Sequence, residues 1–387
     1  MKKYIITGLL IICIILALDS NARSAYFVTA IRSDTTTFVN GRRVVLLSYN
    51  INGSRYMKIR DLAYTLSGTS KQFSVGWSGA QNAILLTSGK PYKAVGGEMS
   101  RSGEATGMAR ISLAKVLLDG NEVSVYVYNY KGENYYRLRD IGRIIDFNVG
   151  WDSSINAVII DTSKRSTDKD ASPNPFIARI RNIDPSKPMV ALTFDDGPGA
   201  QTNAILDILE RHNAKATFFV LGNRVSANNR TISRAYNMGC EIAGHAWSHR
   251  ELTALPESRI RSEIHDTNRA ITSATGAAPT LLRPPYGSVN SRVRSVSQSL
   301  GVPIITWSID TRDWSNRNAN TIYNNVMRNV RNKDIILLHD TYSATTNAIS
   351  RIVPDLISRG YQLVTVSELM YFSGMTPDPG AVYFRAR

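Results

Sequence analysis

Cysteine is nearly absent from this sequence. Only Cys13 and Cys240 occur among its 387 residues, and Cys13 lies inside an N-terminal apolar run. If that run is removed as a signal, Cys240 alone remains and no disulfide can form within the chain. Cys240 lies in the apolar stretch 238–243, so we expect it to be a buried small hydrophobe.

Long apolar runs are also lacking. The run from Ile5 to Leu18 is short for a comfortable membrane span. It follows Lys2 and Lys3 and precedes a polar segment with Ala22-Arg23-Ser24, which is the order of a secretory signal. We therefore expect residues 1–24 to be a signal segment and the protein to be secreted or associated with the cell wall or surface. Contact with a membrane is expected only if this segment stays uncleaved.

Acidic residues are outnumbered by basic ones. The chain has 46 Lys and Arg against 31 Asp and Glu, which gives a formal net charge of +15. Such a protein is attracted to anionic surfaces, and a cell wall rich in phosphate or carboxylate polymers is one of them. The basic residues form no dense block beside aromatic residues, so nucleic acid is not an expected partner. A length of 387 residues predicts two or more domains, and a content of 43% hydrophobic and 20% charged residues is typical of globular ones.

Residues 26–165 contain an internal repeat. Three segments recur in the same order, 52–62 as 131–141, 73–77 as 147–151, and 82–86 as 156–160. Each unit is typical of a glycine-turned hairpin, a short helix near an Arg-Asp pair and two more strands, which predicts a smaller α+β domain built from two repeats. The polar, proline-containing stretch 163–175 is interpreted as the linker to the next domain.

These repeats resemble the copper amine oxidase N-terminal-like domain of secreted proteins of Gram-positive bacteria. Residues 26–165 contain no His and no Cys, so a copper site is not expected. Trp77 and Trp151 hold equivalent positions in the two repeats. One hypothesis is that exposed aromatic rings bind wall or glycan, and the other is a spacer whose Trp side chains belong to the core.

From residue 189 onward, apolar strands alternate with amphipathic helices. The predicted helices include 202–211 and 257–271, in which Ile and Leu recur at helical spacing. The predicted strands are 189–194, 216–221, 240–243, 280–282, 302–308, 335–338 and 362–366. This alternation predicts parallel strands, arranged either as a barrel or as a doubly wound sheet.

The polar residues of this region gather at strand ends. A titratable or charged side chain lies at or just beyond the carboxyl end of five predicted strands, namely Asp195 and Asp196, His245, Arg283, Asp310 with Asp313, and His339. In a parallel barrel these ends form the catalytic face. The pattern therefore predicts an active site at this edge.

A metal site is predicted among these residues. Adjacent carboxylates at Asp195 and Asp196 repel each other unless a cation neutralises them. His245 and His249 are four residues apart, so on a helical turn they would share a face and hold one metal ion. With Asp196 as third ligand, the set leaves open positions for water and is typical of a hydrolytic centre. Taken alone, the Asp-Asp-Gly-Pro segment favours a surface turn and the two His favour a structural pair; their combination favours the metal site.

The remaining strand-end residues suit acid–base chemistry. Arg283 opens the rigid segment Arg-Pro-Pro-Tyr-Gly and can orient a carboxylate base such as Asp195. The alternative is an exposed arginine on a surface loop. His339 follows the buried strand 335–338, and we interpret it as a catalytic acid in preference to a core histidine.

Five motifs of this region match the polysaccharide deacetylase family, also known as carbohydrate esterase family 4, with its NodB-homology domain. In order they are 193–198 (TFDDGP), 245–249 (HxxxH), 283–287 (RPPYG), 310–314 (DTRDW) and 337–339 (LLH). The resemblance covers about residues 176–372, and residues 373–387 follow as a tail. One departure is Ala246, where the family usually has Ser or Thr after the first metal-binding His.

The resemblance implies a distorted (β/α) barrel that is the catalytic domain. It implies a divalent ion, zinc in the first place and cobalt, manganese or nickel as alternatives, held by Asp196, His245 and His249. The implied catalytic residues are Asp195 as base, Arg283 as its tether, His339 as acid and Asp313 as the residue that tunes it. Three residues are implied in substrate binding, namely Tyr286 through its backbone N–H, Trp314 and Leu337.

The function implied by the resemblance is metal-dependent removal of acetyl groups from N-acetylglucosamine residues of cell-wall peptidoglycan. A second hypothesis keeps the hydrolase chemistry and changes the polymer to a chitin-like or other N-acetylated polysaccharide. A third, of a different class, is a wall-binding protein with a vestigial active site, which the complete set of catalytic positions disfavours. The expected partners are an N-acetylglucosamine polymer and the anionic cell wall.

Overall fold

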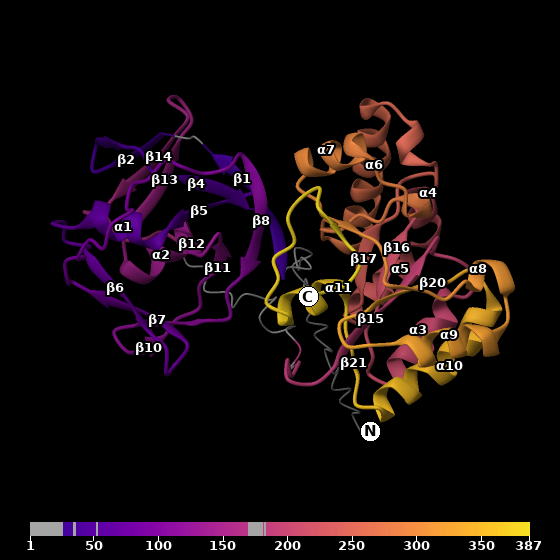
Figure 1. The fold of residues 1–387 in the computed structure, drawn as a ribbon. Coiled ribbons are helices and arrows are strands. Elements are labelled where there is room, and N and C mark those ends of the chain that lie inside the picture. The colour runs from indigo at the N-terminus through magenta and orange to yellow at the C-terminus, as the bar shows by residue number, and fades with distance from the viewer. Residues whose placement is uncertain (1–25, 34–35, 52, 169–180, 182) are drawn as a thin grey trace, which may run out of the picture.

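The computed structural model describes residues 26–33, 36–51, 53–168, 181 and 183–387. The predicted signal segment 1–24 and most of the predicted linker lie outside the described residues. Figure 1 shows two units side by side, an N-terminal unit of strands with two short helices and a C-terminal unit of strands wrapped by helices. No helix in the described part of the chain combines the length and apolar character needed to cross a membrane.

The N-terminal unit is built on a closed antiparallel barrel with the strand order β1-β4-β5-β12-β11-β8. The strands are β1 (Phe27–Ser33), β4 (Ser48–Ile51), β5 (Ser54–Lys58), β8 (Thr106–Ile111), β11 (Val127–Tyr130) and β12 (Glu133–Arg137). Buried Tyr49, Tyr130 and Tyr135 pack together with ring centroids 5.0 to 6.3 Å apart. Closure of the barrel leaves these six strands without a free edge.

The order hairpin, helix, hairpin occurs twice in this unit. The first series is β4, β5, α1 (Ile59–Leu66), β6 (Phe73–Ser78) and β7 (Ala83–Ser88). The second is β11, β12, α2 (Leu138–Ile145), β13 (Asn148–Asp152) and β14 (Ala157–Asp161). The β6–β7 hairpin is extended by β9 (Lys115–Leu118) and β10 (Asn121–Glu122), and the β13–β14 hairpin by β2 (Thr36–Val39) and β3 (Arg42–Val44).

Both helices of this unit bury an apolar stripe in a second core. Leu62 and Leu66 of α1 and Ile141 and Ile145 of α2 recur at spacings of four residues, which places each pair on one helix face. The two repeated Trp side chains are not in that core, because Trp77 is 57% and Trp151 48% exposed. The hypothesis that these rings are core residues is therefore wrong.

The C-terminal unit contains a parallel sheet in the order β17-β16-β15-β20-β19. Its strands are β15 (Met189–Asp195), β16 (Thr217–Val220), β17 (Glu241–Gly244), β19 (Ile309–Asp310) and β20 (Ile335–His339), and β21 (Gln362–Leu363) pairs with the start of β15. Single bridges from Gly244 to Leu282 and from Leu282 to Ile304 continue the sheet to β18 (Ile304–Ile305). Among the described residues no pairing joins β18 to β19, so the barrel is incompletely closed. The predicted parallel α/β arrangement is confirmed.

Helices pack around this sheet. They are α3 (Thr202–Arg211), α4 (Gly222–Val225), α5 (Asn229–Asn237), α6 (Glu257–Thr275), α7 (Ser291–Ser299), α8 (Asp313–Asn316), α9 (Ala319–Asn329) and α10 (Ser343–Ser358). Ile205 and Leu209 of α3 lie on one face and join Phe194 and Phe218 of the sheet in a common core. Strand β15 is buried at every position, which explains why its sequence is an apolar run without alternation.

The last residues of the chain belong to this unit. Residues 373–387, which the sequence analysis treats as a tail, include β22 (Val382–Tyr383), and this strand pairs in parallel with β18. Arg385 forms an ion pair of 2.6 Å with the buried Asp334, and Ala386 is buried. Two-residue pairings of this kind leave no periodic pattern in the sequence, so the element could not be predicted from it.

The two units share one apolar core. β1 and β8 contribute one side of it and α11 (Val366–Phe372) contributes the other. Tyr371 lies between them: its ring centroid is 5.0 Å from that of Tyr26, its hydroxyl donates to the Ile111 carbonyl at 3.3 Å, and the Arg110 guanidinium lies 3.8 Å from the ring centroid. Figure 1 shows α11 on the side of the C-terminal unit that faces β8. The units are therefore packed together and not merely joined by a linker.

We expect Tyr371→Ala to destabilise both units together. Removing a large buried aromatic ring costs about 3–5 kcal/mol, and this ring belongs to a core that both units share. Differential scanning calorimetry should show one unfolding transition for the wild type, and a lower or split transition for the variant. Tyr371→Phe, which loses only the hydroxyl bond, should cost about 1 kcal/mol. An unchanged transition in Tyr371→Ala would contradict the shared core.

Candidate active site

The carboxyl ends of β15, β17 and β20 bring the predicted residues together. Asp195 is the last residue of β15, and His245 directly follows β17. His339 ends β20, where the strand register places it opposite Asp195. Because parallel strands end at the same edge, residues far apart in sequence meet here. The structure thus gathers the predicted strand-end residues at one site.

Three donor atoms converge as a metal site requires. The Asp196 Oδ1 atom lies 3.4 Å from His245 Nε2 and 3.1 Å from His249 Nε2. These three ligand atoms all lie within 4.8 Å of one another. His245 Nδ1 lies 2.7 Å from the Arg283 carbonyl oxygen, which can only accept, so Nδ1 carries the proton and Nε2 is free to bind a metal.

The residues present fit a divalent ion. Asp196 Oδ1 is buried and has no hydrogen-bond partner among the described residues, although two imidazole nitrogens face it. Two imidazoles and one carboxylate are the donor set of many catalytic zinc sites, which keep further positions open. The predicted ligand set is therefore geometrically consistent with binding one ion.

The loop that carries the two imidazoles is held by a residue that the sequence analysis did not find. Glu263 of α6 accepts the backbone N–H of Trp247 at 2.8 Å and of Ser248 at 2.9 Å, and its other oxygen accepts the Ser248 hydroxyl at 2.7 Å. The loop needs such support because Ala246 and His249 have positive φ angles of 65° and 60°. Ala246 itself offers no hydroxyl, and Glu263 supplies the fixing contacts from outside the loop.

Asp195 is oriented by a fully buried arginine. Arg283 Nη1 donates to Asp195 Oδ1 at 2.7 Å and to Thr193 Oγ1 at 2.7 Å. Arg283 Nε and Nη2 donate to the carbonyls of Ile305 and Thr306 at 3.2 and 2.8 Å. Asp195 Oδ2 makes no hydrogen bond among the described residues and lies 3.8 Å from His245 Nε2, at the edge of the donor set. Arg283 is thus not the exposed loop arginine of the alternative interpretation.

His339 is held by a carboxylate. Its Nδ1 lies 2.7 Å from Asp313 Oδ1, and Asp313 Oδ2 accepts the His339 backbone N–H at 2.8 Å and the Thr345 hydroxyl at 2.7 Å. Asp313 is fully buried. Burial lowers the pKa of His339, but the hydrogen bond and charge of Asp313 outweigh it and raise the pKa to about 9. The imidazole is therefore charged at neutral pH.

The predicted substrate-binding residues surround these groups. Tyr286, with a positive φ of 62°, is exposed and its ring centroid lies 4.8 Å from that of His249. Trp314 follows Asp313 on α8 and is half exposed, whereas Leu337 is buried on β20 two residues before His339. Tyr286 therefore lies against a predicted metal ligand, while Trp314 and Leu337 adjoin Asp313 and His339 along the chain.

Asp310 has a structural contact of its own. Its Oδ1 accepts the Arg312 backbone N–H at 2.8 Å and so fixes the turn after β19. The structure thus separates it from Asp313, which binds His339. His265 lies on α6 and His212 directly follows α3, so neither is at a strand end, in agreement with their absence from the predicted site.

Asp340 is a further buried residue that the sequence analysis missed. It follows His339, accepts the Thr202 hydroxyl, and burial raises its pKa to about 7. A Cβ added at Gly197 would collide with this carboxyl group. Gly197 is therefore required by close approach, and Asp340 supports the loop that carries Asp196. No spacing in the sequence signals this contact, because 143 residues separate Gly197 from Asp340.

A parallel α/β arrangement with an Asp-His-His donor set, beside a buried carboxylate and an imidazole held by a second carboxylate, is typical of hydrolytic metal centres. A family profile described as "Polysaccharide deacetylase" matches residues 182–305. The chain is 35% identical over 190 residues to a peptidoglycan-N-acetylglucosamine deacetylase of Bacillus cereus, covering 48% of this chain and 89% of that protein. The chain therefore belongs to the polysaccharide deacetylase family.

Two further comparisons agree with this assignment. The chain is 43% identical over 194 residues to peptidoglycan-N-acetylmuramic acid deacetylase PdaC of Bacillus subtilis, covering 50% of this chain and 41% of that protein. A solved structure described as "T48 deacetylase with substrate" is 35% identical with a TM-score of 0.50, covering 52% of this chain and 99% of the other. The chain thus matches less than half the length of the Bacillus subtilis relative.

We expect Glu263→Ala to weaken metal binding. The variant leaves two backbone N–H groups without their charged acceptor, at a cost of about 1.5–3 kcal/mol for the loop. Titration with zinc followed by calorimetry should show an affinity at least about tenfold lower. Glu263→Gln keeps an oxygen acceptor and should restore most of the affinity. If Ala and Gln variants bind zinc as tightly as the wild type, Glu263 does not position the loop.

Proposed function

We propose that this protein is a metal-dependent hydrolase that removes acetyl groups from N-acetylglucosamine residues of peptidoglycan. The observation that carries the proposal is the pairing of Asp195 and His339 in register on adjacent strands, beside the Asp196, His245 and His249 donor set. One residue is poised to accept a proton and the other to give one, on either side of a metal-binding position. Relatives named as peptidoglycan deacetylases support the substrate class.

Asp196, His245 and His249 would hold the ion, and zinc suits two nitrogens and one oxygen. A bound ion supplies Lewis-acid polarisation of the acetamide carbonyl and makes the attacking water more acidic. The His245 ring is already fixed in the tautomer that presents Nε2, because Nδ1 donates to the Arg283 carbonyl. Little reorganisation of the ligands is then needed on binding.

Asp195 acts as the general base in this proposal. Arg283 occupies its Oδ1, so Oδ2 alone is available to accept the proton of the attacking water. The guanidinium also fixes the rotamer of the carboxylate. Attack on the acetamide carbon gives a tetrahedral oxyanion, near which the Tyr286 backbone N–H is proposed to donate.

His339 acts as the general acid. Asp313 holds its Nδ1 proton, which leaves Nε2 to deliver a proton to the departing amine. Protonation breaks the carbon–nitrogen bond and releases acetate and a free amino sugar. Trp314 and Leu337 are proposed to line the pocket for the acetyl methyl group.

The proposal also covers the location of the protein and the origin of its N-terminal unit. The signal-like segment 1–24 supports action outside the cell, at the wall or surface. The N-terminal unit is proposed to be related to the copper amine oxidase N-terminal-like domain. Its described residues include no His or Cys, so a copper-binding role is not proposed.

We expect acetate release from peptidoglycan to stop after chelation and to return with added zinc or cobalt. Asp195→Asn should retain the metal and lower turnover at least about a thousandfold, because the base is lost and the ligands are not. His249→Ala lacks a proposed ligand and should therefore bind the metal more weakly than the wild type does. Acetate assays and metal analysis by mass spectrometry measure both effects. Full activity in a preparation verified to be metal-free would contradict the proposal.

We expect Asp313→Asn to shift the alkaline limb of the rate profile to lower pH. The acid must be protonated, and its pKa of about 9 keeps activity until the pH rises through that value. Without the Asp313 charge the pKa should fall toward about 6.5, so activity is lost at lower pH. Initial rates between pH 5 and 10 measure the limb. An unshifted limb at near wild-type rate would show that Asp313 does not tune His339.

A further inference from the structure

A pocket of about 310 Å³ lies in the N-terminal unit, far in sequence from the catalytic residues. It is formed by the β4–β5 turn, the start of α2 and the β13–β14 hairpin. Arg55, Arg137, Arg139 and Trp151 line it, and Gly150 and Ser54 complete its wall. The pocket thus combines one exposed aromatic ring with three guanidinium groups.

Trp151 offers a platform for a flat ligand. Its side chain is 48% exposed, and the Arg55 guanidinium lies 5.8 Å from its ring centroid. Gly150 beside it presents no side chain, and a Cβ added there would meet no atom closer than 3.9 Å. A pyranose ring has a face of C–H groups that packs on an indole, and aromatic side chains with exposed faces serve such contacts.

The charges around the platform favour an acidic ligand. Arg137 forms an ion pair of 2.5 Å with Asp140, and its guanidinium lies over the Tyr126 ring. Arg139 is 55% exposed and its nearest carboxylate, Asp168, is 3.9 Å away. A guanidinium with so distant an anion can take a carboxylate in bidentate fashion. Arg139 therefore supplies the charge and Trp151 the apolar surface.

The surroundings of Trp77 in the other repeat keep one of these arginines, because Arg60 stands where Arg139 stands, but they differ at two other positions. In the repeated segments, Asn134 stands where Arg55 stands and Glu133 stands where Ser54 stands. Glu133 also lies 3.8 Å from Lys58 and offsets its charge. Trp77, the counterpart of Trp151, is even more exposed, yet among the described residues no arginine lies over its ring as Arg55 does over that of Trp151. Two substitutions thus make the surroundings of Trp151 more positive than those of Trp77.

We propose that this pocket binds a sugar ring that carries a carboxylate, as part of an N-acetylated glycan strand. The sugar packs on Trp151, and Arg139 with Arg55 pairs with the carboxylate. This deepens the proposed function, on which it rests for the class of polymer, by giving the protein a second contact with its substrate outside the active site. Such a contact raises retention on an insoluble polymer through multivalency.

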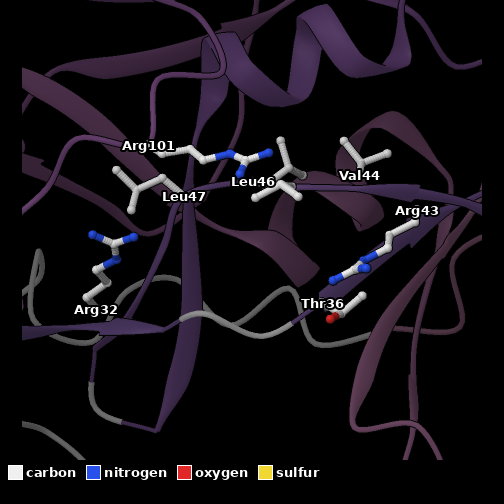
Figure 2. Close-up of a pocket in the computed structure, with 8 residues that line it drawn as sticks. Arg32, Thr36, Arg43, Val44, Leu46, Leu47 and Arg101 are labelled. Atoms are coloured by element: carbon white, nitrogen blue, oxygen red, sulfur yellow. The ribbon is translucent and has the colours of Figure 1, made fainter.

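A second arginine-lined pocket of the same unit provides a control. Figure 2 shows Arg32, Arg43 and Arg101 around an apolar floor formed by Leu46 and Leu47. No aromatic residue lines this pocket, so it lacks a platform for a sugar ring. Removing Arg101 takes away the same single charge as removing Arg139, from a different place on the same unit.

The first experiment measures co-sedimentation of the full chain with bead-linked peptidoglycan glycan strands from which phosphate polymers and stem peptides have been stripped, because a stem peptide ties up the lactyl carboxyl group as an amide. Trp151→Ala and Arg139→Ala should each lower retention about tenfold, since loss of a central aromatic or arginine contact has effects of this size. Trp77→Ala and Arg101→Ala should retain the wild-type level. Equal losses in all four variants would show unspecific attraction and overturn the proposal. Binding that requires the phosphate polymers would overturn the carboxylate assignment.

The second experiment compares two soluble ligands by calorimetry. N-acetylglucosaminyl-N-acetylmuramic acid carries a lactyl carboxylate, and chitobiose is the neutral disaccharide of similar size. Trp151→Ala and Arg139→Ala should each bind the carboxylate-bearing disaccharide more weakly than the wild type does. Arg139→Ala and the wild type should bind chitobiose with nearly the same affinity. Equal affinity of the wild type for both ligands would overturn the proposal.

Hydrolysis separates this proposal from the proposed function. Both pocket variants should release acetate from soluble chitotetraose at the wild-type rate, because the pocket contains no catalytic residue. If neither the wild type nor the variants release acetate, but retention still depends on Trp151, the proposed function fails and the binding site stands. If hydrolysis is normal and retention does not depend on Trp151, the binding site fails alone.

Discussion

The active site depends on one buried arginine. Arg283 has no exposed surface, and its guanidinium donates to Asp195, Thr193 and two backbone carbonyls. Its own carbonyl accepts the Nδ1 proton of His245. One residue therefore fixes the proposed base and sets the tautomer of a proposed metal ligand. Removing one partner of such a buried pair typically costs about 3–5 kcal/mol, because the other charge is left uncompensated.

Carboxylates organise the rest of the site in a similar way. Glu263 accepts two backbone N–H groups of the loop between the imidazoles, and Asp313 accepts the backbone N–H and the ring of His339. In both cases an ionised oxygen fixes a loop or a ring that carries a reactive nitrogen. Charge-assisted hydrogen bonds are shorter and stronger than neutral ones, so they hold side chains with the precision that catalysis requires.

The N-terminal unit packs on the C-terminal unit through a shared apolar core. Arg110 of the N-terminal unit lies over the ring of Tyr371 on α11. The same helix packs against β15 of the C-terminal unit. A unit fixed through an apolar core presents its surface in one orientation relative to the active site, whereas a tethered unit would sample many.

The sequence by itself predicted the parallel α/β arrangement and the residues that gather at its strand ends. Asp195, Asp196, His245, Arg283 and His339 each follow an apolar run, and strand ends in a parallel sheet must share an edge, so their meeting could be predicted without coordinates. The repeat in residues 26–165 could likewise be recognised from the sequence, because equivalent residues recur in the same order.

Tertiary structure alone decided the contacts that cross long stretches of chain. Glu263 and Asp340 support loops from distant helices and strands, and no local spacing encodes which backbone N–H or glycine they will meet. The exposure of Trp151, the use of residues 382–383 as a strand and the core around Tyr371 also depend on packing between elements. Periodicity reports which side of an element is buried, but only the folded chain determines what lies against it.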